Sequence, residues 1–232
     1  TFGDNVTSIG SSALYNCTSL RKVTFGKNLT SVGSNALRNC SALDTIVWNV
    51  KTYNITNSSN TPFNASYVSV YSQIKSFTFG PDVETIPNYL CYNMSKISTT
   101  IIPSSVKSIG TNAFYYCTSV PSLTLNKAIK SYTNQFEYCS GLTKVYYTGS
   151  IEDWCGISFS SSTSNPLYYA KNLYIDNTLA TEITIPSTVK SIGAYQFYNA
   201  SCLTKVTLPS TMATINSSAF CGCSNMAAIN LG

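Results

Sequence analysis

The sequence predicts a β-rich solenoid of about nine coils, in which each coil buries its apolar side against the next. A block of about 23 residues recurs and begins with an apolar residue followed by glycine or another turn-compatible residue. A second bulky residue stands five positions after this anchor, and a cysteine often stands eight positions after it. The anchors are Ile9-Gly10, Val32-Gly33, Ile86-Pro87, Ile109-Gly110, Ile192-Gly193 and Ile215-Asn216. A repeat of this length indicates stacked structural units.

Each block closes with a short strand that carries apolar residues at its first, fourth and sixth positions. The first such run is Leu20/Val23/Phe25, and the last is Met226/Ile229/Leu231. The strands are expected at residues 20–25, 43–48, 74–79, 97–102, 120–125, 142–147, 180–185, 203–208 and 226–231. Because strand side chains alternate between faces, the residues at positions four and six point into the coil. These strands predict one long parallel sheet.

After the strand the chain turns, often at proline or glycine, and a V-x-x-I pattern predicts a second extended segment. A short turn or helical piece that carries the bulky anchor completes the coil. Two coils are longer: the spacing from Trp48 to Phe79 is 31 residues, and that from Tyr147 to Ile185 is 38. Insertions in a solenoid form loops, often on the binding face. The long coils near 49–79 and 148–185 are therefore either recognition loops or tolerated insertions.

The composition indicates a secreted or surface-displayed protein. Charged residues are only 10% of the sequence and the net charge is +5, so serine, threonine, asparagine and tyrosine must cover the surface. The basic residues are scattered, and we expect no nucleic-acid partner. No stretch approaches the roughly 18 apolar residues of a membrane span. Both ends lie inside the repeat, so we expect a single solenoid over residues 1–232 that is part of a longer protein.

The sequence offers no catalytic, cofactor-binding or metal-binding constellation. It contains no histidine, which excludes Ser-His-Asp and Cys-His nucleophiles and zinc sites that use histidine. Its only adjacent carboxylates, Glu152 and Asp153, point to opposite faces of an extended chain. It contains no G-x-x-x-x-G-K-[ST] phosphate loop. We therefore predict that the chain is not an enzyme and needs no cofactor.

Five of the nine cysteines share the repeat position before the strand. These five are Cys17, Cys40, Cys117, Cys139 and Cys223. Stacked side chains point in parallel, which is poor geometry for a disulfide, so we expect a ladder of buried thiols. Cys155, Cys202 and Cys221 fall outside this ladder and are the better candidates for a single bridge.

Several segments resemble the BspA-type leucine-rich repeat. They are V-K-S-I-G-T-N-A-F-Y-Y-C-T-S-V at 106–120 and M-A-T-I-N-S-S-A-F-C-G-C at 212–223, and Y-Y-T-G-S-I-E-D-W-C-G-I at 146–157 resembles a variant coil of that family. The resemblance covers essentially the whole chain. It implies a cell-surface protein of a host-associated anaerobic bacterium, or less often of a mucosal protozoan parasite, that adheres to host matrix proteins or other cells. It transfers no catalytic residue.

The outward side of the strands is the predicted binding surface. It is rich in threonine and mildly basic, with Lys22, Lys144 and Lys205 at the third strand position and Tyr146 at the fifth. Threonine at exposed strand positions also follows from ordinary β-propensity. If a partner docks here, Tyr146 is the expected anchor, because aromatic residues dominate binding hot spots.

We expect a monomeric adhesion module that binds host extracellular-matrix or cell-surface proteins through many weak contacts and multivalent display. Two alternatives stay open. The solenoid could be a structural stalk that spaces another domain from the cell. It could also be a carbohydrate-binding module that uses exposed tyrosines and Trp154. The sequence leaves open whether its N-x-[ST] sequons carry glycans.

Overall fold

Short strands and turns make up most of the computed structural model, which describes residues 1–63, 70–98 and 100–232. The chain is a β-solenoid of about 9 turns, as the repeat predicts. It divides into two compact units: unit 1 contains residues 1–120 and 135–140, and unit 2 contains residues 121–134 and 141–232. Part of the first long coil, and Thr99 in the strand expected at 97–102, lie outside the described residues.

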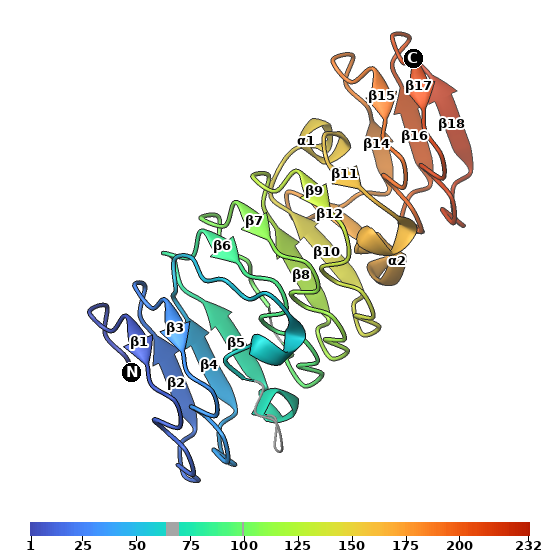
Figure 1. Cartoon of the computed structure of the whole chain (residues 1–232). Coiled ribbons are helices and arrows are strands. Elements are labelled where there is room, and N and C mark those ends of the chain that lie inside the picture. The colour runs from blue at the N-terminus through green and yellow to red at the C-terminus, as the bar shows by residue number, and fades with distance from the viewer. Residues whose placement is uncertain (64–69, 99) are drawn as a thin grey trace. The chain divides into compact units, whose positions relative to one another are not determined.

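In unit 1, three of the strands that close the coils form a parallel sheet (Figure 1). Its order is β2 (Lys22–Phe25), β4 (Thr45–Trp48) and β5 (Ser76–Phe79). The register places Lys22 opposite Thr45, and Thr45 opposite Ser76. Equivalent repeat positions therefore form rows across the sheet.

Unit 2 contains two sheets of such strands. The first is ordered β13 (Thr178–Leu179), β12 (Leu173–Ile175), β10 (Lys144–Tyr147) and β8 (Ser122–Leu125). The second is ordered β14 (Glu182–Thr184), β16 (Lys205–Leu208) and β18 (Ala228–Leu231). All neighbouring strands in them are parallel except β12 and β13, which are antiparallel. The expectation of one long sheet is therefore wrong: among the described residues, the strands that close the coils form three sheets.

The second extended segments form two-stranded parallel ladders, which confirms the V-x-x-I prediction. In unit 1, β1 (Ser8–Ile9) pairs with β3 (Ser31–Val32), and β6 (Thr85–Ile86) pairs with β7 (Ser108–Ile109). In unit 2, β9 (Ser131–Tyr132) pairs with β11 (Ser158–Phe159), and β15 (Ser191–Ile192) pairs with β17 (Thr214–Ile215).

The core lies inside the coils, where the strand pattern predicts it. Positions four and six are buried in β2, β4, β8, β10 and β16. In unit 1, Phe63 packs edge-on against Trp48 and Phe77, with ring centroids 6.1 and 5.7 Å apart. The last strand departs from the pattern, because Ile229 and Leu231 are 48% and 82% exposed. β18 ends its sheet, so its side chains have a neighbouring strand on one side only.

The strands depart from the expectation in two places. Of the described residues in the strand expected at 97–102, Ile101 forms an isolated β-bridge and the others belong to no strand. Thr100 occupies an inward position there, and its buried hydroxyl has no hydrogen-bond partner among the described residues. Conversely, the second long coil contains the hairpin of β12 and β13. Asp176 and Asn177 form its two-residue turn, with φ of 47° and 61°, as the twist of a tight hairpin requires.

Helical pieces are short. The first long coil contains the 3₁₀ turns η1 (Ser58–Asn60) and η2 (Val70–Gln73). The second contains α1 (Ile151–Cys155), η3 (Ser162–Ser164) and α2 (Leu167–Ala170). Glu152 and Asp153 therefore lie on a helix, and the expectation that they lie on an extended chain is wrong. Ser150 caps α1: its Oγ accepts from the Asp153 N–H at 3.1 Å, and its own N–H donates to Asp153 Oδ2 at 3.1 Å. No helix among the described residues is long and apolar enough to cross a membrane.

Many coils place the residue just before the cysteine position in the left-handed conformation. Asparagine, which tolerates this conformation, fills it four times. The positions are Asn16, Asn39, Asn93, Tyr116, Tyr138, Asn199 and Gly222, with φ between 58° and 76°. The asparagines at this position of the repeat therefore suit its turn.

Candidate interaction surfaces

A pair of tyrosines stands on the outward side of the coil-closing strands, which we call the strand face. Tyr146 of β10 lies in register with Tyr174 of β12, and their ring centroids are 4.7 Å apart at an interplanar angle of 32°. On its other side Tyr146 is in register with Thr124 of β8. Both rings are half-buried. Tyr146 was expected on this face, and the structure adds Tyr174 as its neighbour.

The three lysines predicted on the strand face do not form one site. Lys144 is exposed and lies two residues before Tyr146 on the same side of β10. Lys205 of β16 forms an ion pair with Glu182 of β14, with 3.6 Å between Nζ and Oε2. Lys22 is exposed on β2 of unit 1. Only Lys144 therefore adds a positive charge beside the tyrosine pair.

The expectation that Trp154 is an exposed ligand platform is wrong. Its side chain is 0% exposed, with the indole ring 5.2 Å from the Tyr147 ring and 5.8 Å from the Phe159 ring. The indole N–H donates to the Gln196 carbonyl oxygen at 3.1 Å, and the Gln196 side-chain amide donates to the Trp154 carbonyl oxygen. The capped helix α1 turns this side chain inward. Trp154 therefore joins two coils instead of meeting a ligand.

Unit 1 carries a tyrosine cluster on its turns that the sequence analysis did not single out. The cluster is Tyr89, Tyr92, Tyr115, Tyr116 and Tyr138. Tyr92 and Tyr115 stack with their centroids 4.9 Å apart and their planes 9° apart, and Tyr138 meets Tyr115 edge-on at 5.1 Å. Burial, with a smaller contribution from Tyr138, raises the pKa of Tyr115. The Tyr115 phenol therefore stays a neutral donor and acceptor at physiological pH.

Three members of this cluster occupy strained, left-handed positions, and Tyr89 is one of them with φ of 56°. Tyr116 and Tyr138 have φ of 61° and 60°, at the position that other coils fill with asparagine or glycine. A left-handed backbone costs an ordinary residue roughly 1–2 kcal/mol. Both rings are nonetheless about half exposed, at 48% and 47%. The signal in the sequence was a bulky aromatic residue in the turn position of the repeat.

Unit 2 has a smaller group of the same kind. Tyr168 of α2 stacks on Tyr198, with centroids 5.9 Å and planes 11° apart, and Tyr195 meets Tyr198 edge-on at 6.1 Å. Asn165, which is fully buried, donates from Nδ2 to the Tyr195 carbonyl oxygen at 2.7 Å. These tyrosines therefore lie over a contact that holds two coils together.

The predicted ladder of buried thiols is confirmed for Cys40, Cys117 and Cys139, but it is wrong for Cys17 in the first coil, which is exposed, and Cys223 is half-buried. Four ladder cysteines follow another coil in the chain. Each donates from Sγ to the backbone carbonyl oxygen of the bulky residue in the preceding coil, which stands five positions after that coil's anchor. The pairs are Cys40 to Leu14 (3.2 Å), Cys117 to Cys91 (3.2 Å), Cys139 to Phe114 (3.1 Å) and Cys223 to Phe197 (3.1 Å). Burial raises the pKa of Cys139 to about 12 and that of Cys223 to about 11.

The candidate disulfide among Cys155, Cys202 and Cys221 is not formed, since all three are free thiols in the structure. Cys202 is buried, Cys155 is half-buried and Cys221 is exposed. Within the described ranges, no group of three or more cysteine and carboxylate side chains is arranged to hold a metal ion.

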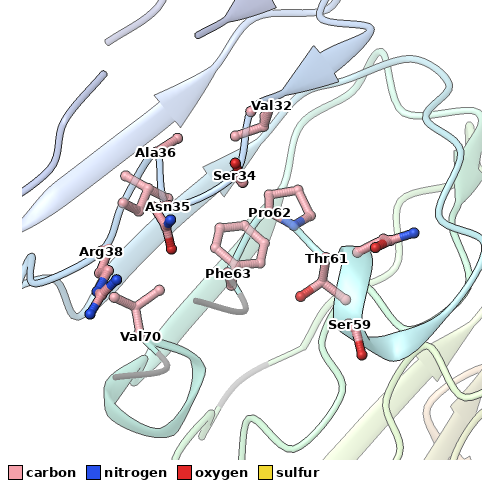
Figure 2. Close-up of a pocket in the computed structure, with 13 residues that line it drawn as sticks. Val32, Ser34, Asn35, Ala36, Arg38, Ser59, Thr61, Pro62, Phe63 and Val70 are labelled. Carbon is pink, nitrogen blue, oxygen red and sulfur yellow. The ribbon is translucent and has the colours of Figure 1, made fainter. Parts of the chain in front are cut away.

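A hollow of about 240 Å³ lies in unit 1 between the turn at 33–38 and the first long coil. Phe63 and Pro62 lie in the middle of its lining, with Arg38 and Val70 toward one end (Figure 2). Phe63 is almost completely buried, and its ring belongs to the aromatic core. Residues 64–69, between Phe63 and Val70 in the sequence, lie outside the described residues, and we assign the hollow no ligand.

Comparison with known proteins identifies the repeat. Six copies of the BspA type leucine rich repeat region match residues 1–70, 64–166 and 169–232. A leucine-rich repeat protein from Bacteroides ovatus has a similar crystal structure, with a TM-score of 0.51 and 18% identity, over 97% of this chain and 70% of that chain. The T. pallidum leucine rich repeat protein gives a TM-score of 0.45 and 22% identity, over 61% of this chain and 66% of that chain. A search of curated proteins gave no match.

These comparisons support the fold and identify the protein family. The likeness to the Bacteroides ovatus protein, at 18% identity, supports the fold alone. Leucine-rich repeats generally serve as interaction or structural modules, and the match indicates no catalytic family. Because the repeat model matches nearly the whole sequence, the chain belongs to the family of proteins with BspA-type leucine-rich repeats.

Proposed function

We propose that this chain is a non-enzymatic adhesion module of a cell surface, which binds host extracellular-matrix or cell-surface proteins through the strand face of unit 2. The observation that carries the proposal is the half-exposed pair of Tyr146 and Tyr174 beside Lys144. Aromatic residues at the centre of a flat, polar surface are the usual energetic anchors of protein interfaces.

The pairing of the two rings favours binding. Each tyrosine restricts the other, so less side-chain freedom is lost when a partner covers them. Lys144 attracts acidic partners, although an exposed charge contributes weakly at physiological salt. Multivalent display then multiplies modest single-site affinities. A surface location is supported by the low charge content and by the family of the repeat.

A second candidate is a carbohydrate-binding module. The observation that favours it is the exposed tyrosine cluster of unit 1, because stacked aromatic rings with hydroxyl groups can pack against sugars. Its anchors are Tyr116 and Tyr138, since Trp154 is buried. The structural stalk remains the third candidate, and it predicts that no part of this chain binds a ligand.

The test is binding of the chain, as a monomer and as a displayed multimer, to purified extracellular-matrix proteins and mucosal glycans at physiological salt. A Lys144→Glu/Tyr146→Ala variant is measured in parallel. We expect a protein ligand, with an affinity at least tenfold lower for the variant. A protein ligand that the variant binds equally well would exclude the strand face. Binding to glycans alone would favour the second candidate, and no binding by the multimer would favour the stalk.

A further inference from the structure

The second long coil contacts the next coil of unit 2, but in the described sheets its hairpin strands β12 and β13 do not pair with a strand of that coil. Away from the strand face, this coil touches residues near 196 directly: the Trp154 indole N–H donates to the Gln196 carbonyl oxygen at 3.1 Å. On the strand face, β13 and β14 follow β12 in the chain before β16 begins. No ladder joins β13 to β14 in the described sheets, since each stands at the end of its own sheet. The strand face is therefore interrupted there by two strand edges.

A groove of about 570 Å³ lies at this interruption. Apolar side chains from three segments line it: Ile151 of α1, Ile175 and Leu179 of the hairpin, and Ile183 of β14. Register places Leu179 beside Tyr174, so the groove adjoins the tyrosine pair. Ile151, Ile175 and Leu179 are only half-buried. Each of them keeps apolar surface that a ligand could cover.

The edge of β14 presents backbone groups to this groove. The Ile185 N–H donates to the Thr207 carbonyl oxygen of β16, and the Thr181 carbonyl oxygen accepts from the Thr204 N–H. Alternate residues of a strand direct their backbone groups to opposite sides. Glu182 and Thr184 therefore direct their N–H and C=O groups away from β16, and both residues line the groove. An open row of donors and acceptors is a template for another strand.

The groove is acidic although the chain is basic overall. Asp176 and Glu182 line it, and no lysine or arginine does, against a net charge of +5 for the whole sequence. Both side chains are exposed, and the one charge partner that Glu182 has in this unit, Lys205, is 3.6 Å away across an exposed ion pair. A ligand with positive charges is favoured over one with negative charges.

We infer that this groove binds an extended peptide segment of a partner protein, with alternating basic and apolar side chains, which adds a strand to the open edge of β14. Backbone hydrogen bonds to Glu182 and Thr184 would hold it, its apolar side chains would cover Ile151, Ile175 and Leu179, and its basic ones would meet Asp176 and Glu182. The inference does not rest on the proposed adhesion function, because Tyr146 and Lys144 do not line the groove.

The test uses a synthetic acetylated octapeptide of alternating lysine and valine, titrated into the whole chain and followed by hydrogen exchange. A second peptide carries N-methyl groups on alternate residues, which removes the hydrogen bonds of one edge. The charge variant is Asp176→Asn/Glu182→Gln, in which asparagine keeps the left-handed turn residue. Its control, Asp82→Asn/Glu137→Gln in unit 1, removes the same net charge outside the groove.

We expect the octapeptide to slow exchange at the amides of Glu182 and Thr184. The charge variant should bind it about fivefold more weakly while the control changes less than about twofold, and N-methylation should weaken binding about tenfold. No binding up to about 1 mM, equal binding of the N-methylated peptide, or protection confined to other strands would each overturn the inference. Protection of the same amides by rising protein concentration alone would show a second copy as the occupant, and would overturn it too. The Tyr146→Ala variant should bind the octapeptide normally, so this test and that of the adhesion function fail separately.

Discussion

At the scale of single residues, the position just before each ladder cysteine has a left-handed backbone. Some residues adopt this conformation easily, and others adopt it only at a cost in free energy. Asn16, Asn39, Asn93 and Asn199 suit the left-handed conformation, whereas Tyr116 does not. Strained residues that persist are often retained for function. The exposed ring of Tyr116 is therefore a better candidate for a contact residue than for a structural one.

Replacing Tyr116 by asparagine should raise the free energy of unfolding by about 0.5 kcal/mol, because relief of strain exceeds the loss of two distant ring contacts. Those rings, Tyr115 and Tyr138, lie 6.4 and 6.2 Å from the Tyr116 ring. The reciprocal change, Asn39→Tyr, should lower it by about 1 kcal/mol. Denaturant unfolding measures both. A clear loss of stability in Tyr116→Asn would mean that this ring is structural.

The thiols offer a second residue-scale prediction. Cys17 and Cys221 are exposed, whereas burial raises the pKa of Cys139 and Cys155 to about 12. Only the thiolate reacts with alkylating agents. At pH 8, iodoacetamide should therefore modify Cys17 and Cys221 rapidly in the folded protein, and all nine cysteines only after denaturation. Rapid labelling of Cys117 or Cys139 in native protein, read by peptide mass spectrometry, would contradict the buried ladder.

At the scale of elements, the second long coil shows where sequence reasoning stops. The apolar positions of the regular strands were predictable because each depends on a local period of two. The inward turn of Trp154 was not, because it depends on Gln196, which lies 42 residues away. The hairpin had a local signal in Asp176-Asn177 between two apolar runs, and the 23-residue repeat obscured it. Tyr174 was missed with it, since it lies on β12.

The buried contact of Trp154 should be separable from binding. Trp154→Phe removes the indole N–H that donates to Gln196, and should cost about 1–2 kcal/mol of stability. Trp154→Ala should cost about 3–5 kcal/mol because it also leaves a cavity. Neither should change affinity for a protein ligand at a temperature where the variant is folded. A Trp154→Phe protein with native stability and lost glycan binding would restore the ligand role that its burial excludes.

At the scale of the whole molecule, the repeat predicted the solenoid but not the continuity of its sheets. Continuity depends on whether consecutive coils bring their strands into register. Thr100, a polar residue at an inward position, lies in the sequence between β5 and β8, which belong to different sheets among the described strands, and the β12–β13 hairpin precedes a second break. Both breaks arise from departures from the repeat. The groove beside β14 is a consequence of the second one, so the repeat alone could not predict it.

The whole chain should have an unusually flat pH dependence near neutrality, since it contains no histidine. Hydrogen bonds from Ser150, together with Lys130, lower the pKa of Asp153, and Lys51 and Lys107 lower that of Glu84. Stability from these lowered pKa values is complete above the ordinary values of 3.8 and 4.5, and is lost as the pH falls through the folded ones. The raised thiol pKa values stabilise the fold below 9.0 and do so less as the pH rises further.

Thermal unfolding should therefore give a nearly constant Tm from about pH 5.5 to 8. Tm should fall below about pH 4.5 and above about pH 9. Asp153→Asn should weaken the acid-side fall and lower Tm modestly at pH 7, because it removes the carboxylate that completes the cap of α1. A steep change of Tm between pH 6 and 7 would contradict the charge assignments.

The central claim is that the tyrosine pair of the strand face anchors a protein partner. The most direct measurement compares the affinity of two variants for a matrix protein that the multimer captures. Tyr146→Ala/Tyr174→Ala removes the pair, and Tyr116→Ala/Tyr138→Ala removes two exposed rings of the tyrosine cluster in unit 1. We predict a loss of at least thirtyfold in the first variant and less than threefold in the second. Equal affinity of the strand-face variant and the unmodified chain, or a loss confined to the second variant, would contradict the claim.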